Sequence, residues 1–143
     1  MPAPGTLVLL RHGQSPLNAQ DRLTGLLDPP LTEAGEGEAA CAATLGSLAS
    51  SSFSRGSVCT SALMRTRDSA HLVLGVLCDA GVQVLGAWEL NGHSCGSLTG
   101  RTGSELLREL GPGVFRFWRR SYYRAPPAMS HAELGAIRRS RAL

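Results

Sequence analysis

An arginine–histidine pair near the start of the chain is the part of the sequence best suited to chemistry. Arg11 and His12 follow four apolar residues, 7–10, and are followed by Gly13. A neutral imidazole can attack phosphorus, and guanidinium groups beside it can balance the charge on the phosphoryl oxygens. The pair therefore indicates a site that accepts a phosphoryl group.

Further arginines occur where an anion-binding site would need them. Arg65 lies in the first turn of a predicted helix, and the N-terminus of a helix already favours anions. Arg119 and Arg120 lie in a later helix and add planar donors that can bind an anion in pairs. The chain contains no lysine, which excludes a P-loop nucleotide enzyme because that motif needs a lysine to reach the phosphates.

The elements that must position these residues alternate between strand and helix. Residues 6–10 predict a buried strand, and residues 56–60 and 82–85 predict two more. The order β-α-β-α-β predicts a parallel sheet with helices on its faces, joined by right-handed crossovers. Ligands bind such sheets at the carboxyl ends of the strands, which is where Arg11 and His12 follow the first strand.

The predicted helices begin at polar residues. Residues 32–48 predict a helix with Thr32 as its N-cap, although Gly35 weakens its first turn. A second helix is expected to begin after Thr60 or Ser61, which would cap it. Two shorter helices are expected later, separated by a Gly-Pro-Gly stop at residues 111–113, because proline and glycine end helices.

Length and composition favour one soluble domain. The chain has 143 residues, 43% of them hydrophobic, and no apolar run near the ~20 residues that span a bilayer. The four cysteines are scattered and form no CxxC pair, so reduced thiols, no metal site and a cytoplasmic location are expected.

The charge is uneven along the chain. Residues 1–100 contain five arginines against eight acidic residues, whereas residues 101–143 contain nine against three. An arginine-rich C-terminal part suits a polyanion or a small phosphorylated ligand, but arginine-rich codon usage would explain the composition equally well. We expect residues 130–143 to be a disordered basic tail, with neither nucleic acid nor a membrane as a partner.

Several blocks, in order along the chain, resemble one enzyme family. They are RHGQS-x-x-N (11–18), LTG-x-x-D-x-x-LTEAG (23–35), TSALMR (60–65), W-x-LN (88–91), G-x-L-x-G (96–100) and FWRRSY (117–122). From about Leu7 to Met129 the chain resembles the 2,3-bisphosphoglycerate-dependent phosphoglycerate mutases of the histidine phosphatase superfamily. The resemblance implies a three-layer α/β/α sandwich around a mostly parallel sheet. Residues 1–129 would form an incomplete domain of this kind because the C-terminal half is missing.

The resemblance also implies roles for particular residues. His12 would be the phosphorylated nucleophile, with Arg11 and Arg65 holding its phosphoryl group. The implied contacts to phosphate or substrate come from both predicted arginine groups and from small polar residues: Arg11, Ser15, Asn18, Thr24, Gly25, Arg65, Arg119 and Arg120. The family interconverts 2- and 3-phosphoglycerate in glycolysis, with 2,3-bisphosphoglycerate as the primer and without a metal.

The chain departs from the family pattern at two positions that matter for activity. The family has a glutamate where this chain has Gly92, and that glutamate exchanges a proton with the substrate oxygen; a solvated loop position is the better expectation for His93 beside it. A second His-Gly motif of the family is also absent. In the family sheet, the strand that carries this motif lies between the first two strands. Without it those two strands must pair directly or leave unpaired edges, so we expect marginal stability or dependence on a partner chain.

Three functions are therefore compatible with the sequence. The first is a phosphoglycerate mutase-like enzyme whose activity is impaired. The second is a non-catalytic, truncated relative or splice product that binds phosphorylated metabolites or a full-length partner. The third is a small-molecule phosphatase. The expected partners are a small phosphorylated substrate and a second chain in a homo- or heterodimer.

Overall fold

The computed structural model describes residues 7–44, 57–77 and 81–140. Its elements follow one another in the order α1 (Pro16–Ala19), α2 (Glu33–Ala43), β1 (Val58–Ser61), α4 (Met64–Val76), β2 (Val84–Ala87), two 3₁₀ turns (Trp88–Leu90 and Gly96–Leu98), α5 (Gly103–Arg120) and α6 (His131–Ser140). The predicted end of the helix over residues 32–48 lies outside the described residues.

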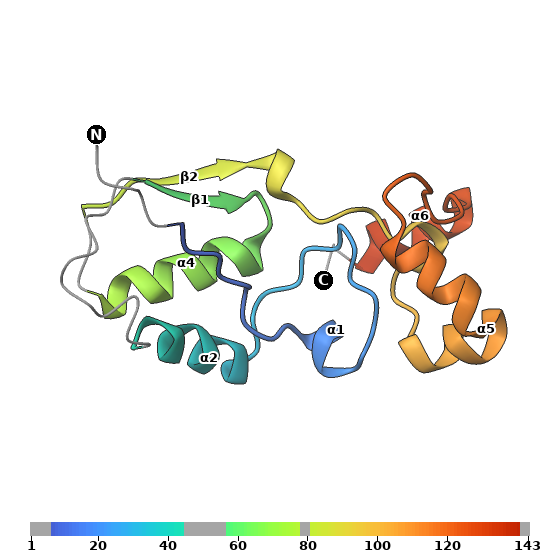
Figure 1. The fold of residues 1–143 in the computed structure, drawn as a ribbon, viewed down its shortest axis with the longest axis horizontal. Helices are drawn as coiled ribbons and strands as arrows, with labels where there is room; N and C mark the ends of the chain where they lie inside the picture. The colour runs from blue at the N-terminus through green and yellow to red at the C-terminus, as the bar shows by residue number, and fades with distance from the viewer. Residues whose placement is uncertain (1–6, 45–56, 78–80, 141–143) are drawn as a thin grey trace.

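A parallel two-stranded sheet forms one side of the molecule. β1 and β2 pair in register from Val58 with Val84 to Ser61 with Ala87. α4 packs against β1, and α2 packs against α4, so that both helices lie on the same side of the strands (Figure 1). The predicted α/β fold with a parallel sheet is confirmed, although β2 begins two residues later than expected.

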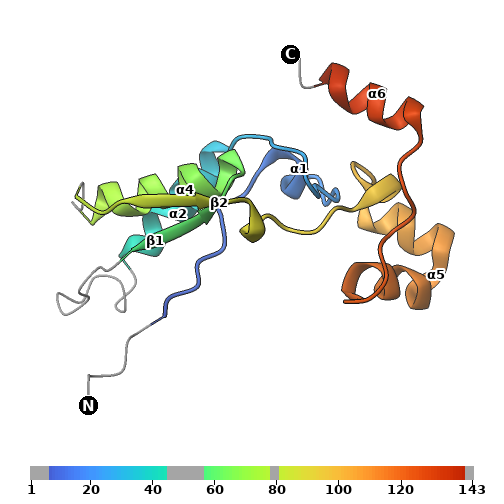
Figure 2. The same cartoon turned by 90° about the horizontal axis from the view of Figure 1, so that it is seen from above.

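The apolar residues before Arg11 do not form the predicted buried strand. Leu7 and Leu9 are 82% and 86% exposed, and residues 7–10 have no backbone hydrogen bond to another described residue. Figure 2 shows this segment running away from the sheet. A run of this kind becomes a buried strand only between neighbours that cover both of its faces. In the described part of the chain β1 pairs only with β2, so the segment remains extended and exposed.

The two long helices of this side begin differently. Thr32 caps α2 as predicted, since its hydroxyl accepts a hydrogen bond from the Gly35 N–H at 3.1 Å. α4 is not capped by Thr60 or Ser61: Leu63 occupies the N-cap position without a side-chain bond. The Ser61 hydroxyl is instead 2.7 Å from the Thr66 hydroxyl, so it fastens the strand end to the first turn.

A second part of the molecule, formed by α5 and α6, is connected to the first by the segment after β2, and the loop after α1 lies against this segment (Figure 1). These loops bond to each other through the backbone: Leu23 N–H donates to the Arg101 carbonyl, and Gly103 N–H donates to the Asp21 carbonyl. The segment that follows His12 is thus fixed against the start of α5.

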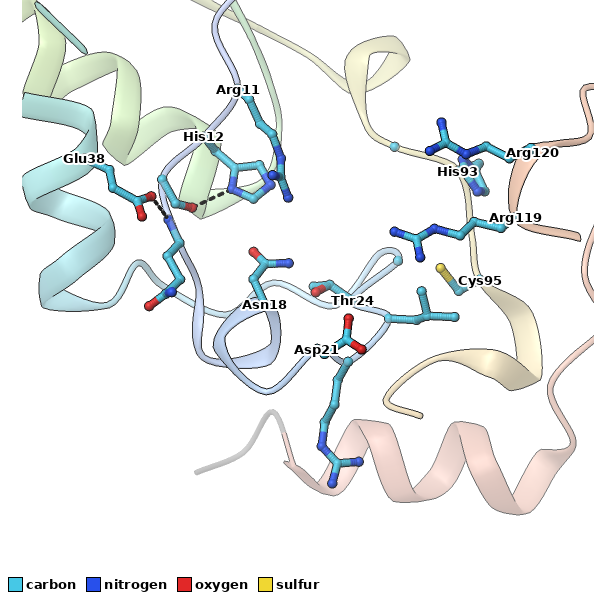
Figure 3. Close-up of a pocket in the computed structure, with 16 residues that line it drawn as sticks. Arg11, His12, Asn18, Asp21, Thr24, Glu38, His93, Cys95, Arg119 and Arg120 are labelled. Carbon is cyan, nitrogen blue, oxygen red and sulfur yellow. Dashed lines mark hydrogen bonds between the residues drawn. The ribbon is translucent and has the colours of Figure 1, made fainter. Parts of the chain in front are cut away.

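α5 contains the interruption that the sequence predicts. Thr102 and Glu105 cap its start reciprocally. The helix kinks at Gly111, whose φ of 74° is left-handed, and Pro112 follows directly. The turns after the kink carry Arg119 and Arg120 toward the first part of the molecule (Figure 3).

Part of the segment expected to be a disordered tail is helical. α6 begins after Ser130, whose hydroxyl accepts a bond from the Glu133 N–H at 3.3 Å while the Glu133 carboxylate accepts from the Ser130 N–H at 2.7 Å. This is a capping box, a signal that composition alone does not show. In the described part of the chain no helix is long and apolar enough to cross a membrane.

The exposure of residues 7–10 can be tested by comparing a substitution there with one in the core. Leu9→Ser should change the free energy of unfolding by no more than about 0.5 kcal/mol, because surface substitutions usually have small effects. Leu106 is fully buried, so Leu106→Ala should destabilise the protein by about 2–5 kcal/mol. Urea unfolding of both variants measures this. A loss at Leu9 equal to that at Leu106 would show that residues 7–10 are buried after all.

Candidate active site

The two ring nitrogens of His12 have different partners. Nδ1 lies 2.7 Å from the carbonyl oxygen of Gly13. Because a carbonyl only accepts, Nδ1 must carry the proton, which leaves the lone pair on Nε2. The Nε–H of Arg65 points at that lone pair across 3.3 Å. His12 is therefore held with its nucleophilic nitrogen facing a guanidinium group.

The surroundings of His12 keep the ring neutral. Partial burial lowers the pKa of His12 below its ordinary value of 6.5, and the charges of Arg65 and Arg11 lower it further. The hydrogen bond to Gly13 and the charge of Glu38 act in the opposite direction. At neutral pH the imidazole is thus unprotonated, as a nucleophile for phosphorus must be.

The lowered pKa predicts how His12 titrates. In an NMR titration the ring proton signal that is lost in His12→Gln should show a midpoint below 6.5. Because the unfolded chain takes up this proton at a higher pH than the folded chain, stability should fall as the pH drops below 6.5 towards the folded-state pKa. His12→Gln should remove this part of the pH dependence. A midpoint above 6.5 would contradict the geometry described here.

Arg65 is buried, with 5% of its surface exposed, and makes three contacts. Besides the contact to His12, it donates from Nη1 to the Leu27 carbonyl at 2.7 Å and from Nη2 to the Gly25 carbonyl at 3.2 Å. Burial lowers the pKa of its guanidinium, and the charge of Asp28 offsets part of this effect. Arg65 thus joins the start of α4, the loop before α2 and the imidazole.

The backbone around His12 depends on two glycines. A Cβ atom at Gly13 would clash with the carbonyl oxygen of Gly35, and one at Gly35 would clash with the carbonyl oxygen of Gln14. The Gly13 N–H donates to the buried Ser69 hydroxyl on α4 at 3.0 Å. Gly35, which weakens the predicted helix, is therefore required for the close approach of α2 to the segment that carries His12.

A cavity of about 600 Å³ opens beside His12 (Figure 3). It lies between the two parts of the molecule. Its lining is mostly polar and cationic: Arg11, His12, Gly13, Gln14, Asn18, Asp21, Arg22, Leu23, Thr24, Gly25, Glu38, Gly92, His93, Cys95, Arg119 and Arg120.

Most of the residues named from the sequence line this cavity. Arg119 and Arg120 face it from the side opposite His12 (Figure 3). Two named residues do not line it. Arg65 is outside the lining and contacts the site through its hydrogen bond to His12 Nε2, whereas Ser15 is fully buried and donates its hydroxyl to Asn18 Oδ1 at 2.7 Å. Ser15 therefore orients Asn18 and caps α1.

One hydroxyl in the cavity wall has no partner. Thr24 is 8% exposed, and its Oγ1 makes no hydrogen bond to any described residue. A buried hydroxyl without a partner is costly, and a polar ligand in the cavity would relieve that cost. The wall thus offers both positive charge and an available hydroxyl to a polyanion.

Some lining residues were missed or given another role in the sequence analysis. Glu38 accepts a hydrogen bond from the Gln14 N–H at 2.9 Å, and Asp21 lies on the same loop as Thr24. Neither lies in a motif that the sequence alone singles out. His93, expected to be a solvated loop residue, is exposed but also lines the cavity. Cys95 faces the cavity too, and burial raises the pKa of its thiol.

Comparison with known proteins shows which family this chain matches. The histidine phosphatase superfamily (branch 1) matches residues 7–142. The chain is 40% identical over 121 residues to a 2,3-bisphosphoglycerate-dependent phosphoglycerate mutase of Bifidobacterium longum, covering 85% of this chain and 48% of that protein. A mutase of the same name from Corynebacterium glutamicum is 37% identical over 126 residues, covering 88% and 50%. The chain spans about half the length of the curated relatives it matches.

Solved structures with the same fold include phosphatases. A mycobacterial glucosyl-3-phosphoglycerate phosphatase in complex with VO3 aligns over 93% of this chain and 63% of that chain, at 26% identity and a TM-score of 0.67. A mycobacterial hydrolase aligns over 93% of this chain and 60% of that chain, at 27% identity and a TM-score of 0.68. From the family match and the shared fold it follows that this chain belongs to branch 1 of the histidine phosphatase superfamily.

Proposed function

We propose that the protein transfers phosphoryl groups through a phosphohistidine at His12, in the manner of a phosphoglycerate mutase. The observation that carries the proposal is the lone pair of His12 Nε2 beside a buried arginine, at the edge of a cavity lined with further arginines. The names of the curated relatives point to the same reaction.

The proposed reaction begins at His12. Nε2 attacks a phosphorus atom of 2,3-bisphosphoglycerate, the primer; an N–P bond forms, a P–O bond breaks, and the leaving oxygen takes up a proton. The phosphoryl group displaces the hydrogen bond from Arg65, whose N–H then bonds to a phosphoryl oxygen. His12 next passes the phosphoryl group to a hydroxyl of 2- or 3-phosphoglycerate. The cationic wall and the unpartnered Thr24 hydroxyl fit these small polyanions.

In this proposal the substrate is bound mainly by the cavity wall opposite His12. Arg119 and Arg120 would hold the carboxylate or distal phosphate, because each guanidinium can donate to two oxygens at once. Asn18, Thr24 and Gly25 would contact the phosphate nearer to His12. No step in this scheme needs a metal.

The reaction should be slow. Gly92 lines the cavity at the position where the resembling mutases have the glutamate that moves a proton. Loss of a general acid–base group costs about 10²- to 10⁴-fold in rate. We therefore propose an impaired mutase. Its resemblance to the mutase family leads us to propose a role in glycolysis, in the cytoplasm.

A phosphatase is the second candidate. Two of the structural neighbours are named as a phosphatase and a hydrolase, and the cavity is open enough for water to reach a phosphoryl group on His12. A protein that only binds phosphorylated metabolites, alone or as a homo- or heterodimer, is the third. Such a protein would bind the anion with the arginines of the cavity and would not use the lone pair of His12 Nε2.

One incubation distinguishes the three. The protein is mixed with 3-phosphoglycerate and 2,3-bisphosphoglycerate, and 2-phosphoglycerate and inorganic phosphate are measured separately. A mutase forms the isomer, with free phosphate as a minor product. Free phosphate without the isomer would support the phosphatase instead. Neither product from a folded sample would overturn both enzyme functions and leave the binding protein.

A further inference from the structure

A second cavity lies beside the first, along the last turns of α5. Its volume is about 560 Å³, and it is lined by Phe115, Arg116, Arg119 and Arg120. These residues follow the spacings i, i+1, i+4 and i+5, which places them as two adjacent pairs on one side of the helix. None of the sequence motifs assigns a function to Phe115 or Arg116.

Arg119 and Arg120 line both cavities, so the two spaces meet at these side chains. The guanidinium of Arg119 lies 5.8 Å from the centre of the Phe115 ring, within the range of a cation–π contact. Burial raises the pKa of Cys95 in the first cavity, and the charge of Arg119 counteracts it. Arg119 thus contacts Phe115 in the second cavity, while its charge acts on Cys95 in the first.

The charges around the second cavity are not balanced by the protein. Arg116 and Arg120 are four residues apart on one helix, where like charges repel. Neither forms an ion pair with a carboxylate in the part of the chain that the structure describes. The C-terminus of the helix offers these cations some stabilisation, but an anion between them would remove the repulsion directly.

We propose that the space bounded by Phe115, Arg116, Arg119 and Arg120 is a second anion subsite, which binds the distal phosphate or carboxylate of an elongated phosphate ester whose first phosphate lies at His12. This inference rests on the proposed function of His12. It extends the substrate class from phosphoglycerate to longer phosphate esters that carry a second anionic group.

The length of the ligand can be tested with synthetic rulers. The probes are α,ω-alkanediol bisphosphates from three to eight carbons, with alkyl monophosphates of the same lengths as controls. Binding is measured by calorimetry on His12→Gln, so that no probe is consumed. Affinity should rise about tenfold or more once the second phosphate reaches Arg116, because a hydrogen bond to a charged group contributes that much. The monophosphates should show no such rise.

Matched variants locate the effect. Arg116→Gln, made in the same background, should abolish the gain for the long bisphosphates and leave the short ones unchanged. Arg108→Gln removes the same charge from an exposed position of the same helix that lines neither cavity, and it should keep the gain. Thermal unfolding of both variants without ligand separates ligand binding from a role of Arg116 in stabilising the helix end.

Two outcomes would overturn the subsite: affinity that does not depend on length, or a gain that persists in Arg116→Gln. The proposed function fails in a different way, namely if the protein with His12 intact takes no phosphoryl group from 2,3-bisphosphoglycerate. The length dependence is a binding measurement, so the two results are read independently.

Discussion

Replacing Arg65 with alanine should slow the phosphorylation of His12 about 100- to 1,000-fold, the usual effect of removing one donor that stabilises a developing negative charge. The Nε–H of Arg65 points at Nε2 across 3.3 Å, where the incoming phosphoryl oxygens would lie. Its other two N–H groups hold the carbonyls of Gly25 and Leu27, which fixes the loop in place. The rate is measured as transfer of labelled phosphate from the primer under single-turnover conditions.

Two controls separate charge from structure. Arg65→Lys keeps the positive charge but cannot make the three contacts at once, so it should recover only part of the rate. Arg67→Ala removes an exposed arginine two residues further along α4 and should leave the rate unchanged. Because Arg65 is buried, circular dichroism and thermal unfolding must show that each variant is folded. A folded Arg65→Ala protein that is phosphorylated at the normal rate would show that Arg65 does not act on the phosphoryl group.

Gly92→Glu should restore activity rather than remove it. The position lines the cavity, and a Cβ atom there would meet nothing within 4 Å, so a side chain can begin at this position without a clash. A carboxyl group at this point would supply the proton transfer that the resembling mutases obtain from their glutamate. The rate of 2-phosphoglycerate formation should rise about 10²- to 10⁴-fold.

The matched control is Gly92→Gln, which has almost the same shape and hydrogen-bonding reach but cannot transfer a proton. It should remain as slow as the unmodified protein. Equal rates for the glutamate and glutamine variants would mean that a missing acid is not what limits this chain.

The sequence predicted best those elements whose determinants are local. Thr32 caps α2 because its hydroxyl reaches the N–H three residues on, and the kink in α5 follows from Gly111 and Pro112. The segment 7–10 was predicted wrongly because burial of a strand depends on its neighbours, and the described sheet provides none for it. The helix after Ser130 was not predicted because a basic composition favours disorder, whereas the helix begins at a local capping box of Ser130 and Glu133.

The sequence predicted the site residues that lie in recognisable motifs. It did not predict those that only the packing of the fold brings to the cavity. Arg11, His12 and Arg119 were named from the sequence, and all three line the cavity. Glu38 and Asp21 reach the same cavity only because α2 packs beside Gly13 and because the loops cross before α5. Such long-range contacts leave no trace in the spacing of residues along the chain.

The central claim, that the imidazole of His12 accepts a phosphoryl group, is tested most directly by incubating the protein with 2,3-bisphosphoglycerate labelled with ³²P. We expect a covalent label that is stable in base, is released by acid and is lost in His12→Ala. A folded protein that acquires no label, or a label that persists in His12→Ala, would contradict it.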